Sequence, residues 1–345
     1  MATAAHDGYD FPDQYAQYVN REKDMIHASR MQIAIAAAGV LIATSASATE
    51  VRYYPVPKGS HPHDVALAAD GSVWYTAQSR GELGLLDQAT GKTEHVALGR
   101  GSSPHGVIVG PDSAAWVTDS GLNAIVRVDQ KTRAVKVFPL PAGTPYTNLN
   151  TAAFDKNGIL WYTGQSGYYG SVNPASGEVR VWAAPKGRGP YGIAATPAGD
   201  IYYASLAGSH IASIDIITGK VTMIEPPTKD QGARRVWSDS KGNIWVSEWL
   251  SGNLSMYNPA DRSWKIFKPP VDMPKTYSVY VDDKDMVWIT EWTSNAIMRF
   301  DPRSQKWDSY PSNGRAAAVR QMLGRSGEAW GAESSNDRLV VVREK

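Results

Sequence analysis

The sequence SPHGV at residues 103–107, followed by AWVTD at residues 115–119, decides the fold, because this unit returns about every 42 residues. In each copy a short apolar run precedes a turn, and an aromatic residue follows the turn at a constant phase. Neighbouring aromatic residues are 42, 45, 41, 43, 43 and 42 positions apart: Trp74, Trp116, Trp161, Tyr202, Trp245, Trp288 and Trp330. A period kept through most of the chain predicts one repeat architecture.

Each repeat contains four short segments with strand patterns, separated by turn residues. In the second repeat the segments cover residues 105–109, 114–119, 124–129 and 134–140. No segment has a convincing helical period. Four antiparallel strands repeated seven times predict an all-β fold, a seven-bladed β-propeller, in which neighbouring blades bury each other's faces. We expect the periodic aromatic residues to pack between blades.

The two ends of the repeat region complement each other. Residues 51–57 (VRYYPVP) have the pattern of the last strand of a repeat, although they precede the first repeat. The seventh repeat ends at residues 338–342 (RLVVV), one strand short. We therefore predict that the N-terminal strand closes the last blade, which would leave the ring without a long open edge.

The first 48 residues lie outside the repeats. An apolar run at about residues 33–44 and small residues up to Ala48 have the pattern of a secretory signal peptide cleaved after Ala48. The run is too short to span a bilayer. We predict an N-terminal extension plus signal peptide in residues 1–48, a propeller in residues 49–345, and a periplasmic or secreted monomer. An uncleaved anchor after a cytoplasmic extension is the alternative, and Met25 and Met31 are alternative starts.

Composition excludes several classes of function. The 35 basic and 34 acidic residues give a net charge of +1, whereas a nucleic-acid binder needs a basic surface. The chain has no Cys, so it has no disulfides, thiolate metal sites or Cys nucleophile. It also lacks the Gly-x-Ser-x-Gly motif of serine hydrolases.

The repeats resemble those of virginiamycin B lyase-like (streptogramin B lyase-like) propellers. The segments that carry the resemblance are PHGV at 104–107, WITEW at 288–292, NAIMRF at 295–300 and YYPVP at 53–57. The resemblance covers about residues 50–343. It implies a carbon–oxygen lyase that opens a cyclic depsipeptide at its ester by elimination. It also implies Mg²⁺ held by glutamates and a histidine base, all in the last two blades.

The family's site residues do not recur in direct register. The positions of the two family histidines hold Tyr277 and, approximately, Val319. A family glutamate falls near Ala317, and Glu333 alone matches the glutamate after the last-blade Trp.

The pseudo-symmetry of the ring offers the same positions in other blades. His63 and His105 follow Pro in the first two repeats, as the family histidines do, and they are our candidate catalytic bases, because imidazole titrates near neutral pH. The polar position after the periodic aromatic gives four candidate ligands for Mg²⁺: Asp119, Glu248, Glu291 and Glu333. Ion pairs of these carboxylates with Arg234, Arg235 and Arg320 are the alternative.

The starts of the first strands are expected to meet near the axis, where a ring of side chains would form a funnel for a small molecule or a cyclic peptide. The candidate substrate-binding residues are Asn150, Tyr191, Arg234, Trp249, Tyr277 and Trp292. In a lyase, His63 or His105 would remove the proton next to an ester carbonyl, and a divalent cation or an Arg would stabilise the enolate. A non-catalytic binding propeller is the alternative, and a lactonase-type metal hydrolase is a weaker one.

Overall fold

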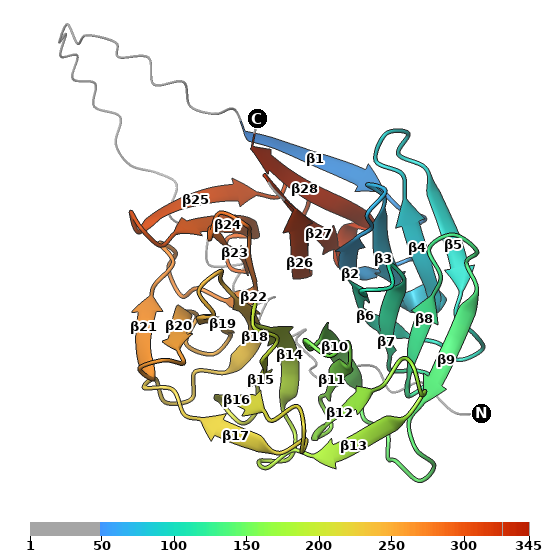
Figure 1. Cartoon of the computed structure of the whole chain (residues 1–345). Coiled ribbons are helices and arrows are strands. Elements are labelled where there is room, and N and C mark those ends of the chain that lie inside the picture. Colours follow the sequence, from blue (N-terminus) through green and yellow to red (C-terminus); the bar gives the residue numbers. More distant parts are fainter. Residues whose placement is uncertain (1–48, 326, 345) are drawn as a thin grey trace, which may run out of the picture. The chain divides into compact units, whose positions relative to one another are not determined.

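The computed structural model describes residues 49–325 and 327–344, and these form seven four-stranded antiparallel sheets arranged in a ring (Figure 1). The predicted signal peptide and its cleavage site at Ala48 lie outside the described residues. Within the described ranges, no helix has the length and apolar character needed to cross a membrane.

In six blades the four strands are consecutive in the chain and pair in order. Blade 1 contains β2 (Pro62–Leu67), β3 (Val73–Ala77), β4 (Glu82–Leu86) and β5 (Thr93–Ala97). Blade 2 contains β6 (Pro104–Val109), β7 (Ala115–Asp119), β8 (Ala124–Val128) and β9 (Val135–Pro139). Blade 3 contains β10 (Leu149–Phe154), β11 (Leu160–Gly164), β12 (Tyr168–Val172) and β13 (Val179–Ala183). Blade 4 contains β14 (Pro190–Ala195), β15 (Ile201–Ser205), β16 (His210–Ile214) and β17 (Val221–Ile224). Blade 5 contains β18 (Ala233–Ser238), β19 (Ile244–Glu248), β20 (Leu254–Asn258) and β21 (Ser263–Phe267). Blade 6 contains β22 (Thr276–Val281), β23 (Val287–Glu291), β24 (Ala296–Asp301) and β25 (Lys306–Pro311).

The seventh blade combines both ends of the described chain, as the sequence predicts. It contains β26 (Val319–Arg325), β27 (Glu328–Glu333), β28 (Arg338–Glu344) and β1 (Thr49–Pro55). β1 pairs with β28 in a continuous register from Thr49 opposite Glu344 to Pro55 opposite Arg338. Short 3-10 turns, η2 (Gln78–Arg80) and η3 (Ser334–Asn336), follow β3 and β27.

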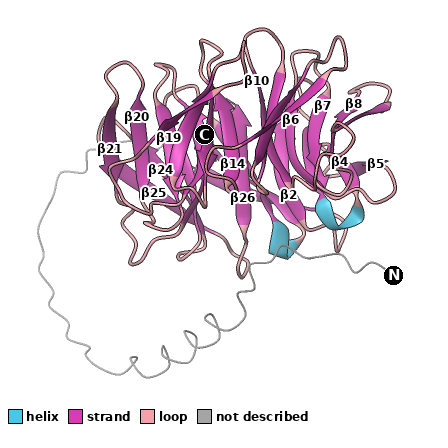
Figure 2. Cartoon of the chain, turned by 90° about the horizontal axis from the view of Figure 1, so that it is seen from below, coloured by secondary structure: helices cyan, strands magenta, loops and turns pink. Residues whose placement is uncertain are grey.

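The first strands of the blades form a closed inner circle. Each contacts the first strand of the next blade, and β26 contacts β2. Seen from the side, the strands of neighbouring blades stand next to one another, with loops at both ends (Figure 2). Positions in phase in the repeat therefore occupy equivalent places around one axis.

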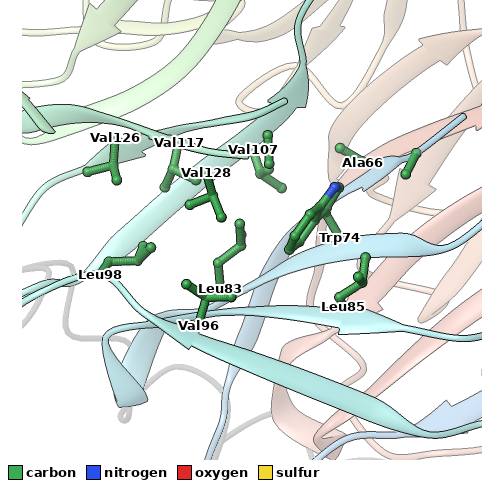
Figure 3. Packing of buried hydrophobic residues seen from close by; sticks show 12 residues of the cluster. Ala66, Trp74, Leu83, Leu85, Val96, Leu98, Val107, Val117, Val126 and Val128 are labelled. Carbon is green, nitrogen blue, oxygen red and sulfur yellow. The ribbon is translucent and has the colours of Figure 1, made fainter. Parts of the chain in front are cut away.

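Packing between blades explains the periodic aromatic residues. Figure 3 shows Trp74 and Leu83 of blade 1 packed with Val107 and Val117 of blade 2. The six periodic Trp side chains are each at most 2% exposed, and Tyr202 is 9% exposed. Several indole N–H groups donate to an Asp carboxylate of their own blade, for example Trp288 to Asp282 at 2.8 Å. In Trp116, Trp161, Trp245 and Trp288 the ring thus buries apolar area while its polar atom stays satisfied, whereas the indole nitrogen of Trp330 is buried without a hydrogen-bond partner.

Candidate functional site at the propeller axis

In every blade the register between the first and second strands shifts at the same place, close to the start of the first strand. The shifts lie between Pro62 and Val65, Pro104 and Gly106, Leu149 and Ala152, Pro190 and Ile193, Ala233 and Arg235, Thr276 and Ser278, and Val319 and Met322. Such bulges turn a side chain away from the regular alternation of a strand. We call the end of the ring where the first strands begin the site mouth.

Side chains at these bulges meet across the ring. The guanidinium of Arg235 in blade 5 lies 3.4 Å from the carboxylate of Asp64 in blade 1. The phenol oxygens of Tyr191 in blade 4 and Tyr277 in blade 6 are 2.7 Å apart. Because these residues come from blades that are not neighbours, they approach each other near the axis.

His63 is oriented by the residue that follows it. Its Nδ1–H donates to Oδ1 of Asp64 at 2.7 Å, and both side chains are buried. Asp64 also accepts from Arg235, which donates in addition to Thr151. This hydrogen bond fixes the tautomer of His63 and leaves its Nε2 as the basic nitrogen. Among the described contacts of His63, none is a hydrogen bond to Nε2.

His105 has both ring nitrogens occupied. Its Nδ1–H donates to the backbone oxygen of Asn150 at 3.1 Å, and the Asn150 amide donates to Nε2 at 3.3 Å. Gly106 permits this close approach, because a Cβ there would lie 2.5 Å from the same Asn150 oxygen. The ring of His105 packs against the ring of His63 with centroids 3.9 Å apart. His105 therefore supports the ring of His63 and has no free nitrogen.

The charges around the pair affect its protonation. Burial, followed by the guanidinium groups of Arg320, Arg235 and Arg234, lowers the pKa of His63 well below its usual value. Burial and the neighbouring His63 ring lower the pKa of His105 in the same direction, against the effect of Asp64. Both rings are therefore neutral at pH 7. Burial raises the pKa of Asp64, and Arg235 opposes that shift.

An aromatic cluster adjoins the histidine pair and holds Arg234. The guanidinium carbon of Arg234 lies 3.6 Å from the ring centroid of Tyr277, and it also lies over the rings of Tyr191 and Trp249. Tyr277 stacks on Trp292, with centroids 4.6 Å apart and planes at 9°. The predicted substrate-binding side chains Tyr191, Arg234, Trp249, Tyr277 and Trp292 are thus in mutual contact, whereas Asn150 belongs to the His105 side.

The seventh position of the ring differs from the sequence prediction. Val319, the expected counterpart of Tyr277, pairs with Glu333 and packs in an apolar cluster. Its neighbour Arg320 lies within the register shift, and its guanidinium carbon is 5.6 Å from the Trp292 ring centroid. The bulge therefore gives this place to Arg320.

The four predicted metal ligands lie at the site mouth, because each ends a second strand opposite the start of a first strand. Each nevertheless accepts hydrogen bonds from its own blade. Glu291 accepts from the backbone of Lys275, Thr293 and Ser294, while Glu333 accepts from Arg338 and Ser312. Asp119 accepts from the Ser103 and Leu122 amides, and Glu248 from Ser251, with its Oε1 unpartnered.

The predicted ion pairs of arginines with these carboxylates do not form. Arg235 pairs with Asp64, and the partner of Glu333 is Arg338. In the described part of the chain, the group of His, Asp or Glu side chains whose ligand atoms lie close enough to share a metal ion is His63, Asp64 and His105, with those atoms within 4.8 Å of one another.

Sequence reasoning did not single out Asp64 as the partner of His63. Its sequence position, directly after the histidine, would place it on the opposite face of a regular strand. The Pro-His-Asp triplet at residues 62–64 is the signal that points to it, once a bulge is assumed at this point of each blade.

The described chain is therefore a seven-bladed β-propeller. Histidine, arginine and aromatic side chains gather near its axis. Residues 34–266, more than half of the chain, match the virginiamycin B lyase family. The chain belongs to the virginiamycin B lyase family. A search of curated proteins finds no match by sequence.

Solved structures share the fold. A streptogramin B lyase is 19% identical with a TM-score of 0.79, over 86% of this chain and 98% of that one. A catalytically inactive variant of virginiamycin B lyase from Staphylococcus aureus with quinupristin is 19% identical with a TM-score of 0.78, over 86% and 99%. The extracellular domain of a hybrid two-component system protein from B. thetaiotaomicron is 15% identical with a TM-score of 0.65, over 86% and 43%.

Proposed function

We propose that this protein is a carbon–oxygen lyase in which His63 is the general base. The hydrogen bond of 2.7 Å between His63 and Asp64 carries the proposal. A carboxylate on Nδ1 holds the imidazole in the tautomer that accepts a proton at Nε2 and stabilises the imidazolium that forms. The proposal favours His63 over His105 as the base, because both nitrogens of His105 are engaged in hydrogen bonds.

The elimination begins at His63. Nε2 of His63 takes the proton from the carbon next to a carbonyl or carboxyl group, and the electrons of that bond form the new carbon–carbon double bond. The bond from the neighbouring carbon to the leaving oxygen breaks, and the oxygen leaves with the electron pair. The imidazolium or solvent then protonates it. A guanidinium at the site, with Arg234 the nearest to the aromatic cluster, stabilises the negative charge that develops on the substrate oxygen.

Mg²⁺ does not fit the residues that would hold it. It prefers oxygen ligands in octahedral geometry. The carboxylates at the family-like positions Glu291 and Glu333 are occupied by amide, hydroxyl or guanidinium donors. The group formed by His63, Asp64 and His105 offers two imidazoles and one carboxylate beside Arg235, which repels a cation. The guanidinium groups thus take the electrostatic role of the metal.

The same donor set disfavours the lactonase alternative, because a metal hydrolase needs a bound ion to activate water. Elimination requires no activated water. A family member's known ligand provides the first compound to test: the virginiamycin B lyase variant that shares this fold was solved with quinupristin.

A non-catalytic binding propeller is the second candidate. Two observations favour it: His63 and His105 are each only 4% exposed, and the family match ends at residue 266, before blades 6 and 7. The resemblance places the lyase machinery in those two blades, where Tyr277 replaces a family histidine. We also propose that the protein acts outside the cytoplasm. The predicted signal peptide and a related extracellular propeller domain support this location.

The test is incubation of the purified protein with quinupristin, with and without a chelator, followed by mass spectrometry. A lyase opens the ester without a change in mass, whereas a hydrolase adds one water. We expect the His63→Gln variant to be inactive and the His61→Gln variant, altered at an exposed position, to keep its activity. Unchanged quinupristin together with saturable binding would favour the binding propeller.

A further inference from the structure

Of the three arginines beside the histidine pair and the aromatic cluster, only Arg235 has a carboxylate in contact in the described part of the chain. Arg235 has Asp64 as its partner, at 3.4 Å. In the described part of the chain, neither Arg234 nor Arg320 forms an ion pair with a carboxylate. Both histidines are neutral at pH 7, so they leave this balance unchanged. Two guanidinium charges therefore remain without a counter-charge in contact.

The contacts of Arg234 are all to neutral groups. Its Nη2 donates to the Tyr191 hydroxyl at 2.9 Å, which is within 2.7 Å of the Tyr277 hydroxyl. Three aromatic rings surround its guanidinium carbon at 3.6 to 4.8 Å. Its Nε is buried and has no hydrogen-bond partner. Rings and phenols stabilise a cation, but they do not neutralise it.

The second arginine belongs to the same cluster. Arg320 lies over the ring of Trp292, which stacks on Tyr277, and Tyr277 contacts Arg234. Although burial opposes the shift, the guanidinium groups of Arg234, Arg320 and Arg235 lower the pKa of Tyr277. Arg234, Trp249, Trp292 and Arg320 are partly exposed, unlike the buried Tyr191 and Tyr277. Solvent therefore reaches the arginines and the two indoles.

We propose that this cluster binds the carboxylate of a ligand, with Arg234 and Arg320 as its anion-binding groups and Trp249 and Trp292 as the surfaces for an attached ring. A guanidinium presents paired N–H donors that match a carboxylate in geometry and charge. Partly exposed indoles favour a planar or cyclic carbon skeleton. Such a ligand supplies the counter-charge that Arg234 and Arg320 lack among their described contacts.

That this carboxylate belongs to the substrate rests on the lyase function proposed above. A proton next to a carboxylate is difficult to remove, because the enediolate that forms carries a second negative charge until the leaving oxygen departs. Guanidinium groups on the carboxylate lower that cost. The substrate class is then a cyclic or ring-bearing acid with an oxygen leaving group on the carbon two bonds from the carboxyl carbon. Elimination from it gives an unsaturated acid and an alcohol.

Calorimetric titration of the full chain tests the site. The probes are benzoate, phenyl phosphate and the uncharged benzamide. We expect benzoate to bind at least about tenfold more tightly than benzamide, as one charge-assisted hydrogen bond would produce. Tighter binding of phenyl phosphate would identify the anion as a phosphate and overturn the assignment to a carboxylate. Equal binding of benzoate and benzamide, or no binding of either anion, would overturn the site.

Variants locate the site. Arg234→Gln and Arg320→Gln should each lower the affinity for benzoate by about tenfold or more. The control is Arg180→Gln, which should leave the affinity for benzoate unchanged. Arg180 is exposed on β13, the outer strand of blade 3, and pairs with Glu178. If Arg234→Gln does not fold, the partly exposed Arg320 still provides the test. Wild-type affinity in a folded Arg320→Gln protein would overturn the proposal.

A third variant separates this site from the proposed reaction. His63→Gln should retain benzoate affinity within about twofold, since it removes no guanidinium donor. Benzoate binding without turnover of any ring-bearing acid would contradict the proposed lyase function but support the proposed anion-binding site. Turnover that benzoate does not inhibit would contradict the proposed anion-binding site but support the proposed lyase function.

Discussion

Nδ1 of His63 lies 2.7 Å from Oδ1 of Asp64, the residue that directly follows it in β2. In a regular strand these two side chains would point to opposite faces of the sheet. The register shift between Pro62 and Val65 removes that alternation and lets them meet. The orientation of the His63 ring is therefore a consequence of local backbone geometry in the first blade.

The first prediction concerns the tautomer of His63. Asp64→Asn keeps the shape of the side chain but removes the charge that stabilises the imidazolium. With an active substrate, we expect kcat to fall by about 10³-fold or more, as for other carboxylate–histidine pairs. Steady-state kinetics measures kcat, and ¹⁵N NMR of the ring nitrogens reports the tautomer of His63. Asp87→Asn, at an exposed turn, is the matched control; a kcat for Asp64→Asn close to that of the control would contradict the assignment.

The second prediction concerns pH. His63 and His105 have lower pKa values in the folded protein than the usual 6.5, so below that pH the unfolded chain binds more protons. Stability should be fully present above pH 6.5 and should fall as the pH drops from there towards the lower folded values. The facing charges are Asp64, Arg234, Arg235 and Arg320, and the raised pKa of Asp64 opposes the effect at more acidic pH.

Thermal melts between pH 7.5 and about pH 5 measure this slope. The double variant His63→Asn with His105→Asn should flatten it. His61→Asn is the control, because His61 is exposed and has a φ of 44°, a conformation that Asn accepts. A slope that persists unchanged in the double variant would show that other groups produce the acid sensitivity.

The third prediction concerns the carboxylates at the site mouth. Glu291 accepts four hydrogen bonds from the loops around it, so Glu291→Gln should lower the free energy of unfolding, by about 1–3 kcal/mol, with no effect on metal affinity. Chemical denaturation measures the loss of stability. Titration calorimetry with Mg²⁺ and Ca²⁺ should give no binding heat for either protein. Binding by the wild type that Glu291→Gln abolishes would restore the metal-dependent mechanism.

The repeat made the fold predictable. An aromatic residue kept in phase from Trp74 to Trp330 fixes the number of blades, because each copy must fill the same gap between two sheets. The closing strand was predictable for a related reason: residues 51–57 have the pattern of a strand that the seventh repeat lacks. Both inferences use alternation and period, which the sequence displays directly.

The site was predictable only in part. The candidate ring placed His63, Tyr191, Arg234 and Tyr277 together, and in the structure they lie at one mouth. Contacts that depend on a bulge were not predictable, because a register shift of one residue exchanges Val319 for Arg320 and brings Asp64 to His63. The carboxylates at the repeated position in blades 2, 5, 6 and 7 looked like metal ligands, yet each accepts hydrogen bonds from nearby turn and strand groups of the protein.

The last prediction concerns the closure of the ring. β1 pairs with β28 over its full length, and Tyr54 and Val56 pack in a cluster with Trp330 and Leu339. A chain that begins at residue 57 should lose this outer strand, expose β28 as an open edge, and melt at a much lower temperature with a tendency to associate. Circular dichroism and size-exclusion chromatography measure both effects. A chain that begins at residue 49 is the control; because it keeps β1, it should melt as the full chain does. Equal melting temperatures for the two shortened chains would mean that the N-terminal strand adds nothing to the seventh blade.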